Sequence, residues 1–517
     1  MSVRPHSVHG GRGRGLWGRC AVLTVYAMLS GCAVGPTFVR PAPPSVRAYT
    51  TAAPKLAIRG QPVQRLAIGQ RIPTQWWHLF HSPELDRVIR QALARNPTLS
   101  AAQDTLAEAR ESVLEARGGY YPQIDLGASA ERQRGPAFAL GLLPAKPGLP
   151  EFDLYSLGPT VSYSLDVFGL TRREVEESQA VAETEDDQLA AAYLTISGNV
   201  VTDALTLASI RFQITAVRHI IADDERNLAL VRLKVAGGLA PRSDVLIAET
   251  QLATDRALLP PLAQQQAVAE DALAVLVGRP PGAWAPPSFT LSQFTLPAVL
   301  PLSLPSTLVR QRPDILAAEA QVHARSAAIG VATAQMYPNI VLSGSIATAA
   351  LSVGSLFGAS SDVWSAAAGL TAPIFHGGAL EAGKRRAIDA YRVSVEVYRQ
   401  TVLAAFGQVA DTLRALGHDT ELAAAEHQAL EVAQASLRMQ RASYSAGRSD
   451  LLQLLDAERS VEQARLADAR ATAARYVDSA QLLVALGGGW WRNPKICVAC
   501  GRPKSIPTRV PAVHDDQ

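Results

Sequence analysis

The chain has 517 residues, of which 48% are hydrophobic and 18% are charged, enough to bury a large core. Its formal net charge is +3, but four of its 49 basic residues lie in the first 31 positions; without that segment, 45 basic residues face 46 acidic ones. A chain so close to neutral lacks the basic surface of a nucleic-acid-binding protein. Long stretches rich in Ala, Leu, Gln, Glu and Arg favour extended helices over a compact α/β enzyme.

The N-terminus has the pattern of a bacterial export signal. A basic stretch without acids is followed by ten apolar residues, too few to cross about 30 Å of hydrocarbon, which takes roughly 20. Small residues then precede Cys32, and Leu-Ser-Gly-Cys at 29–32 resembles the lipobox, in which the signal is cleaved before an acylated cysteine. We predict a signal peptide over 1–31, lipidation at Cys32, and an acylated, extended segment over 32–75.

The rest of the chain is an internal duplication. The segment from Asn96 to Ser129 overlays the segment from Arg312 to Ser345 without a gap, at an offset of 216 residues. A Pro-rich stretch separates the two copies. We therefore predict repeat 1 over 76–278, a linker over 279–304, repeat 2 over 305–489, and a C-terminal tail over 490–517.

Each repeat contains a pair of alternating segments after its Tyr-Pro motif. In repeat 1, Ile124 and Leu126 alternate with Gln123 and Asp125, the period of a strand with one apolar and one polar face. The partner segment adds polar positions at Ser162 and Asp166. We predict four strands, at about 122–134, 154–168, 338–350 and 362–376.

Two very long helices follow the strands. The segments at about 170–236 and 379–446 contain no proline, and each is about 100 Å long at 1.5 Å per residue. Each ends at a Gly-containing turn and is followed by a returning helix, for which Ser243 and Ser449 are candidate N-terminal caps. A soluble coiled-coil stalk is the alternative for the helices alone. The mature chain has no other run of about 18 apolar residues, so strands are the predicted membrane-crossing elements.

Four strands cannot close a membrane barrel, because the smallest barrels have eight and an open edge in lipid leaves backbone groups unpaired. Several chains must therefore contribute their strands to one shared barrel. Two chains give eight strands, whose interior is filled by side chains, whereas three give twelve and leave a passage. The polar residues of the strands suit the wall of such a passage, so we predict a homotrimer.

The chain resembles the TolC-like outer-membrane efflux family, in its NodT-type lipoprotein branch of resistance-nodulation-division efflux systems. The resemblance covers about residues 32–489 and rests on these motifs: Cys32-Ala-Val-Gly-Pro36, Trp76-Trp77, Asn96-Pro97-x-Leu99, Tyr121-Pro122, Asp166-Val-Phe-Gly169, Arg312-Pro-Asp-Ile315, Tyr337-Pro338, Pro373-Ile-Phe375 and Leu455-Asp-Ala457. It implies a mainly α fold with a small β part: two internal repeats whose trimer forms a 12-stranded membrane β-barrel, continued by a periplasmic α-helical coiled-coil tunnel.

The same resemblance implies the partners. These are a periplasmic adaptor (membrane fusion) protein, an inner-membrane efflux transporter and outer-membrane lipid. Docking would use the tips of the helical hairpins, for which we name Gly237, Gly238, Ser243, Asp244, Gly447, Ser449 and Asp450. The predicted function is the exit duct of a tripartite efflux pump for drugs or other toxic small molecules; the alternative is a duct for secreted polypeptides.

One stripe of the repeat 2 returning helix is a candidate periplasmic gate. Leu452, Asp456 and Arg459 are spaced i, i+4 and i+7, so they share a helix face near the turn. Threefold symmetry would turn them into rings, and the resemblance assigns these positions to the constriction. Repeat 1 has Thr250 and Ala253 instead of the charged pair, so we expect its hairpin to lie outside the constriction. The alternative is an ordinary surface ion pair.

Other function classes find little support. The ten histidines are scattered, and the sequence has no phosphate-binding loop or nucleophile elbow, so we expect no catalytic residue, cofactor or metal. His376 falls at a predicted turn after the last strand. Cys497 and Cys500 form an incidental tail motif or a local disulfide rather than a zinc site, because no second ligand pair is near. A lipidated periplasmic adaptor is the rival class, but it would lack two β-hairpins and the duplication.

Overall fold

The computed structural model describes residues 33–46, 48–51, 56, 64–134 and 151–489. These residues form two compact units, and each unit takes segments from both halves of the sequence. The described residues of the first unit fall within Met1–Pro41, Leu106–Thr184 and Ala318–Tyr398, and those of the second within Ala42–Thr105, Glu185–Ala317 and Arg399–Gln517. The signal peptide, the acylation site at Cys32 and the tail with Cys497 and Cys500 lie outside the described residues.

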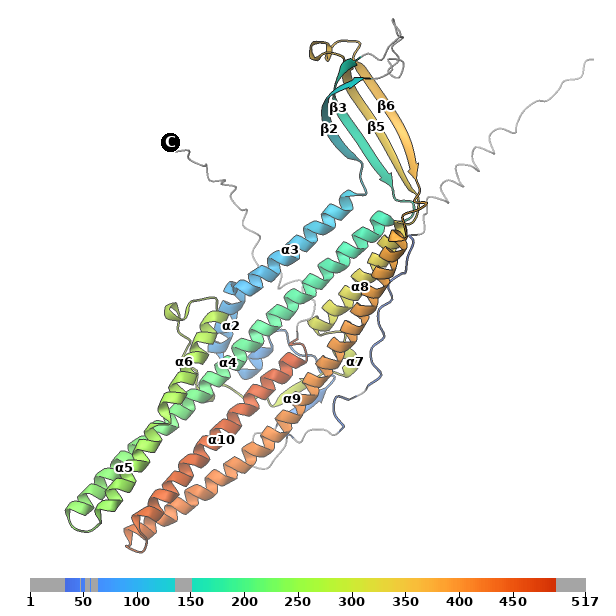
Figure 1. Cartoon of the computed structure of the whole chain (residues 1–517). Helices are drawn as coiled ribbons and strands as arrows, with labels where there is room; N and C mark the ends of the chain where they lie inside the picture. The colour runs from blue at the N-terminus through green and yellow to red at the C-terminus, as the bar shows by residue number, and fades with distance from the viewer. Residues whose placement is uncertain (1–32, 47, 52–55, 57–63, 135–150, 490–517) are drawn as a thin grey trace, which may run out of the picture. The chain divides into compact units, whose positions relative to one another are not determined.

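A four-stranded antiparallel sheet is the β part of the first unit (Figure 1). Its strands are β2 (Gln123–Arg134), β3 (Glu151–Leu165), β5 (Asn339–Ala350) and β6 (Asp362–Thr371). The strand order is β2-β3-β5-β6, so each repeat contributes one hairpin and the two hairpins pair through β3 and β5. Among the described residues, β2 and β6 are the edge strands of this sheet, and each has one side of its backbone without a strand partner.

Two strands end earlier than the sequence pattern predicts. β3 spans Glu151–Leu165 rather than about 154–168, and β6 ends at Thr371 rather than near 376. Asp166 was expected in the polar row of β3, and this prediction is wrong. Its carboxylate instead accepts hydrogen bonds from the backbone N–H groups of Thr171, at 3.1 Å, and Arg172, at 3.0 Å, in the first turn of the following helix. After β6, Pro373 lacks the N–H that a strand ladder needs.

The long helices agree with the sequence prediction. α4 spans Leu170–Ala236 and α9 spans Ala379–Ser445. The helices that precede the two hairpins, α3 (Pro97–Gly118) and α8 (Pro313–Ala334), both begin at the predicted proline. An additional helix, α2 (Pro83–Arg95), ends just before Asn96, whose side chain accepts the N–H of Thr98 at 2.9 Å and so caps α3.

The returning helices differ between the repeats. In repeat 2 one continuous helix, α10 (Leu451–Ala485), returns from the turn. In repeat 1 the single predicted helix is two, α5 (Arg242–Arg256) and α6 (Leu259–Leu276). The break precedes Pro260 and Pro261, which have no N–H to continue the hydrogen-bond ladder and are tolerated only in the first turn of a new helix.

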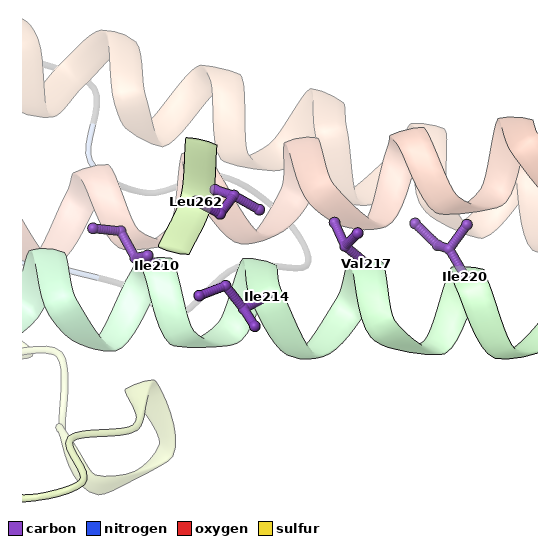
Figure 2. Packing of buried hydrophobic residues seen from close by; sticks show 5 residues of the cluster. All are labelled: Ile210, Ile214, Val217, Ile220 and Leu262. Atoms are coloured by element: carbon purple, nitrogen blue, oxygen red, sulfur yellow. The ribbon is translucent and has the colours of Figure 1, made fainter. Parts of the chain in front are cut away.

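Apolar packing between helices forms the core of the second unit. Figure 2 shows Ile210, Ile214, Val217 and Ile220 on one face of α4, with Leu262 of α6 against them. The spacing of three to four residues is that of a helix with one buried stripe. By length and composition α4 could cross a membrane, although no such helix was predicted for the mature chain, but 61% of its apolar stretch is buried within the protein. A packed core helix meets the same criteria.

The two segments expected to be extended connectors contain regular structure. β1 (Arg65–Ile68), within the N-terminal segment, pairs in parallel with β4 (Val299–Leu302) of the inter-repeat linker. The Gln64 amide donates to Pro297 O at 3.1 Å and to Ser479 Oγ of α10 at 3.0 Å, which fixes this small sheet on a helix. The remaining short elements are η1 (Trp76–Phe80), η3 (Pro281–Ala283), η4 (Leu291–Gln293), α7 (Pro305–Leu308) and η5 (Val353–Ser355).

The residues directly after Cys32 are held in the first unit by backbone and side-chain contacts. Val34 N–H donates to Phe168 O at 3.1 Å, just after β3. The buried Arg173 guanidinium of α4 donates from Nε to Val34 O at 3.0 Å and from Nη2 to Gly35 O at 3.3 Å. At Gly35, φ is +95°, and a Cβ there would lie 2.5 Å from the Cα of Gly330 in α8. The chain therefore needs glycine at this crossing.

Aromatic and ionic contacts continue this docking along α8. The Phe38 ring stacks on His323 with ring centroids 4.4 Å apart. His323 Nε2 lies 3.1 Å from Glu176 Oε1, and Arg40 forms an ion pair with Glu319. Residues 33–41 are thus a docked part of the first unit rather than a free tether.

Candidate constriction and hairpin tips

Glycines in the left-handed conformation end both long helices. Gly238 has φ +71°, and Leu239 N–H donates to Lys234 O at 2.9 Å. In repeat 2, Gly447 has φ +69°, and Arg448 N–H donates to Ser443 O at 2.9 Å. These bonds satisfy the last helical carbonyls, and only glycine adopts such a φ without strain. The two hairpin tips therefore use the same closing chemistry, as the duplication predicts.

The predicted caps of the returning helices are wrong. α5 begins after Pro241, which offers no side-chain acceptor, and the Ser243 hydroxyl faces Asp244 Oδ1 at 3.4 Å instead. α10 is capped by Asp450, whose carboxylate accepts the N–H of Gln453 at 2.8 Å. The helix starts one residue later than expected, so Asp450 takes the cap position and the buried hydroxyl of Ser449 is left without a hydrogen-bond partner.

The residues named for docking form two small exposed tips within the second unit. Gly237, Gly238, Ser243, Gly447 and Asp450 are exposed, while Asp244 and Ser449 are half-buried. Leu239, between the tip glycines and α5, is 81% exposed. An apolar side chain at the end of a hairpin is available for contact with another protein.

The predicted gate residues share the free face of α10. The other face packs on α9 through Leu437, Leu454, Ala457 and Val461. Leu452 is 51% exposed, and the side chains of Asp456 and Arg459 are 65% and 53% exposed and ion-paired with each other. The structure thus brings the three residues onto one stripe, but within a single chain the ion pair is also that of an ordinary helix surface.

Repeat 1 presents a different surface at the equivalent positions. Leu246 is 57% exposed, as Leu452 is, but Thr250 donates its hydroxyl to the Leu246 carbonyl at 2.8 Å, and Ala253 offers no polar group. The charged pair is therefore a feature of the repeat 2 hairpin.

Polar contacts that no local sequence pattern indicates join the two hairpins near their tips. Glu458 of α10, whose side chain is 15% exposed, accepts hydrogen bonds from Asn227 of α4 and from Arg441 of α9. Nearer the tips, Lys234 of α4 donates to the Tyr444 hydroxyl, with its ammonium 4.0 Å from the ring centroid. Residues more than 200 positions apart carry no local signal of such pairing. These contacts tie α10 and α9 to α4 of the repeat 1 hairpin.

Two carboxyl pairs lie inside the hairpins. Burial, a hydrogen bond with Asp255 of α5 and nearby acids raise the pKa of Asp224 in α4 to about 8. Burial and a hydrogen bond with Asp419 raise the pKa of Asp478 in α10 to about 7. A raised pKa means that the fold favours the protonated acid, so each contact weakens as the pH rises from the ordinary carboxyl range towards these values.

No candidate metal centre is found in the described ranges. Among these residues, no group of three or more His, Cys, Asp or Glu side chains could hold a metal ion. His376 lies in the turn between β6 and α9, as predicted, and is exposed.

Residues 88–279 and 304–488 match the family described as outer membrane efflux protein. The chain belongs to this family. A relative, the pyoverdine export outer membrane protein OpmQ of Pseudomonas aeruginosa, is 31% identical over 80% of this chain and 87% of its own length. The probable outer membrane lipoprotein SilC of Salmonella typhimurium is 26% identical over 91% of this chain and 98% of its own.

A solved structure agrees with the fold. The open-state outer membrane channel MtrE of Neisseria gonorrhoeae superposes with a TM-score of 0.77 and 26% sequence identity, over 89% of this chain and 99% of that one. The protein is therefore an outer-membrane efflux channel with the TolC-like fold, mainly helical with a small strand part. Its relatives are channel proteins rather than enzymes.

Proposed function

We propose that three copies of this efflux protein form one duct, a 12-stranded membrane barrel continued by a helical tunnel. The observation that carries the proposal is the four-stranded sheet with two unpaired edges, β2 and β6. A membrane-embedded edge must be paired, because each unsatisfied backbone group in lipid costs several kcal/mol. Pairing β6 of one chain with β2 of the next removes every edge, and three chains give a lumen that two would not.

Large apolar side chains that are exposed in the single chain support the proposal that one face of the sheet contacts lipid. Ile124 and Leu126 of β2 are 70% and 76% exposed in the single chain, and Trp364 and Leu370 of β6 are 77% and 68% exposed. Such a row of large apolar side chains is stable in contact with lipid rather than with water.

Native mass spectrometry of the detergent-extracted, acylated protein tests the assembly. We expect a complex of three chains that resists dissociation, because its barrel shares a continuous hydrogen-bonded sheet. A complex of two chains, or a monomer with conductance in planar bilayers, would refute the threefold barrel.

Within the assembly, we propose that the duct is passive and has no catalytic step. The tips with Gly237, Gly238 and Gly447 would dock on a periplasmic adaptor and an inner-membrane transporter, and Leu452, Asp456 and Arg459 would form the periplasmic constriction. The cargo would be drugs or other toxic small molecules, with secreted polypeptides as the alternative. We propose the domain organisation that the sequence predicts: repeat 1 over 76–278, a linker over 279–304, repeat 2 over 305–489 and a tail over 490–517.

We propose lipidation of Cys32 as an accessory anchor, because the barrel strands themselves cross the membrane. Replacing Cys32 with Ser should lower the amount of protein sorted to the outer membrane while the trimer that does form keeps its conductance. Membrane fractionation and single-channel recording measure the two effects. An unfolded, monomeric Cys32→Ser product at the outer membrane would show that the lipid is the principal determinant of assembly.

A further inference from the structure

The returning helix of repeat 1 is interrupted beside a buried aspartate. α5 ends at Arg256 and α6 begins at Leu259, followed by two prolines that cannot continue the backbone hydrogen-bond ladder. Asp255, in the last turn of α5, is 9% exposed. Because the regular ladder stops there, α6 does not fix the direction of α5, which depends instead on the contacts of α5 with α4. The break is therefore a candidate hinge.

The contact between Asp255 and α4 joins two carboxyl groups. Asp224 of α4 forms a hydrogen bond with Asp255. On the α5 side, Gln251 donates from Nε2 to Asp255 Oδ2 at 2.7 Å. The Oδ2 atom of Asp224 is buried and has no N–H or O–H donor among the residues that the structure describes. Ionised carboxylates only accept hydrogen bonds, so a bond between the two requires a proton on one of them.

Apolar side chains pack next to the pair. Leu228 lies four residues from Asp224, and Leu252 lies three residues from Asp255, so each leucine shares a helix face with its aspartate. Both leucines are buried in the cluster that joins α4 and α5, together with Ala248. A carboxyl group in such a setting is more stable as the neutral acid, because burial penalises its charged form. Removing the shared proton would leave two like charges with no hydrogen bond between them.

The equivalent hairpin of repeat 2 has apolar residues in place of the pair. α4 and α9 both contain 67 residues and begin 209 positions apart, so Asp224 corresponds to Ala433. An offset of 206 positions between the returning helices makes Val461 of α10 the equivalent of Asp255. Val461 is buried in the apolar cluster between α9 and α10, and Ala433 packs against it. α10 is also unbroken. The hairpin fold itself therefore requires neither the acid pair at this position nor the break.

Acids dominate the charged groups around the pair. Asp223 of α4 and Glu458 of α10 face Asp224 and raise its pKa. Further along α10, Glu462 faces Asp223 and His219. The neighbouring arginines are each paired with another acid: Arg226 with Asp223, Arg256 with Glu225, Arg441 with Glu458 and Arg465 with Glu462. Loss of the shared proton therefore adds a negative charge to surroundings that are already acidic.

We propose that Asp224 and Asp255 form a proton-dependent latch across the repeat 1 hairpin. One proton shared by the two carboxyl groups holds the end of α5 on α4. When that proton passes to water, both groups are anionic and the end of α5 moves away from α4 about the break before α6. The step is a reversible proton transfer, and no other covalent bond forms or breaks. Neither the threefold barrel nor the constriction enters this inference.

The sign and the pH range follow from the shifted pKa. Burial, followed by the hydrogen bond with Asp255, raises the pKa of Asp224 from 3.8 to about 8 when the latch is closed. In the open hairpin the carboxyl group returns to its ordinary pKa of about 3.9. The closed state therefore binds the proton more tightly, and the latch weakens as the pH rises from the ordinary range to about 8, above which the effect levels off. Between pH 7 and pH 9 the equilibrium constant for opening should rise about tenfold.

Hydrogen–deuterium exchange of the full-length protein in detergent tests the latch. Protection factors of residues 242–256, corrected for the pH dependence of the intrinsic exchange rate, are compared at pH 7 and pH 9. We expect the protection factors of α5 to fall about tenfold, and those of α8, which lies outside the hairpins, to stay the same. Protection of α5 that does not fall would overturn the latch.

Three variants assign the response to the pair. Asp224→Asn provides an amide N–H that donates to Asp255 at both pH values, so its α5 protection should stay high at pH 9. Asp224→Ala combined with Asp255→Val, which copies the residues of repeat 2, should also remove the pH response. Asp478→Asn, in the carboxyl pair of repeat 2, should leave the tenfold fall in α5 unchanged. If α5 of Asp224→Asn still loses protection tenfold, other groups control the hairpin and the latch is wrong.

Discussion

Replacing Gly35 with valine is expected to detach the N-terminal segment from the first unit and to cause the largest loss of stability among the single changes considered. The residue has φ +95°, and its Cβ would lie 2.5 Å from the Cα of Gly330, a backbone atom that cannot rotate away. Strain at a positive φ and overpacking each cost about 1 to 3 kcal/mol, so we expect a loss of roughly 2 to 6 kcal/mol. The hydrogen bonds from Arg173 to Val34 O and Gly35 O would be lost with the contact.

Gly69 provides the matched control for this change. It also has a positive φ, of +82°, but a Cβ there meets nothing within 4 Å. Gly69→Val therefore measures the backbone strain alone, and the difference between the two variants measures the close approach of Gly35 to Gly330. Thermal unfolding of the purified trimers and limited proteolysis after residue 33 are the measurements. If the two substitutions lower the stability equally, the close approach of Gly35 to Gly330 contributes nothing to the stability of the fold.

Replacing Asp456 with alanine is expected to increase the leak through the closed channel about tenfold, which corresponds to about 1.4 kcal/mol. In the proposed threefold constriction, three carboxylates on the free face of α10 are each paired with an Arg459. Without the carboxylates, three guanidinium groups would face one another across the pore, and their repulsion would favour the open state. Single-channel recording in planar bilayers at low salt measures the leak.

The matched control for the gate is a pair of the same kind elsewhere on a long helix. Asp411 and Arg414 of α9 are also an exposed i, i+3 pair, with Nη1 and Oδ1 3.6 Å apart. Asp411→Ala should leave the leak unchanged, because such a surface pair contributes only a few tenths of a kcal/mol. Thr250→Ala, at the equivalent position of repeat 1, should also have no effect. If the closed-state leak of Asp456→Ala equals that of the unmodified channel, the stripe is an ordinary solvated helix face and not a gate.

Helix and strand identity were predictable because they depend on local periodicity. The alternation of Ile124 and Leu126 with polar neighbours marks a strand wherever that strand lies, and proline-free runs of some 67 residues mark α4 and α9. The duplication also showed which residues differ between otherwise equivalent hairpins, and so singled out Asp456 and Arg459. Caps were less predictable: Ser449 and Asp450 both have suitable side chains, and the start of the helix decides between them.

The sequence by itself determined the secondary-structure elements of this protein: two repeats, each with a strand pair and a long helical hairpin. Tertiary structure decided what those elements touch. Pairing of β3 with β5 joins the repeats into one sheet, packing of α5 on α4 brings Asp255 to Asp224, and Glu458 meets Asn227 across 231 residues. Periodicity fixes how a side chain is oriented on its own element, but contacts between distant segments depend on register and packing, which no local pattern encodes.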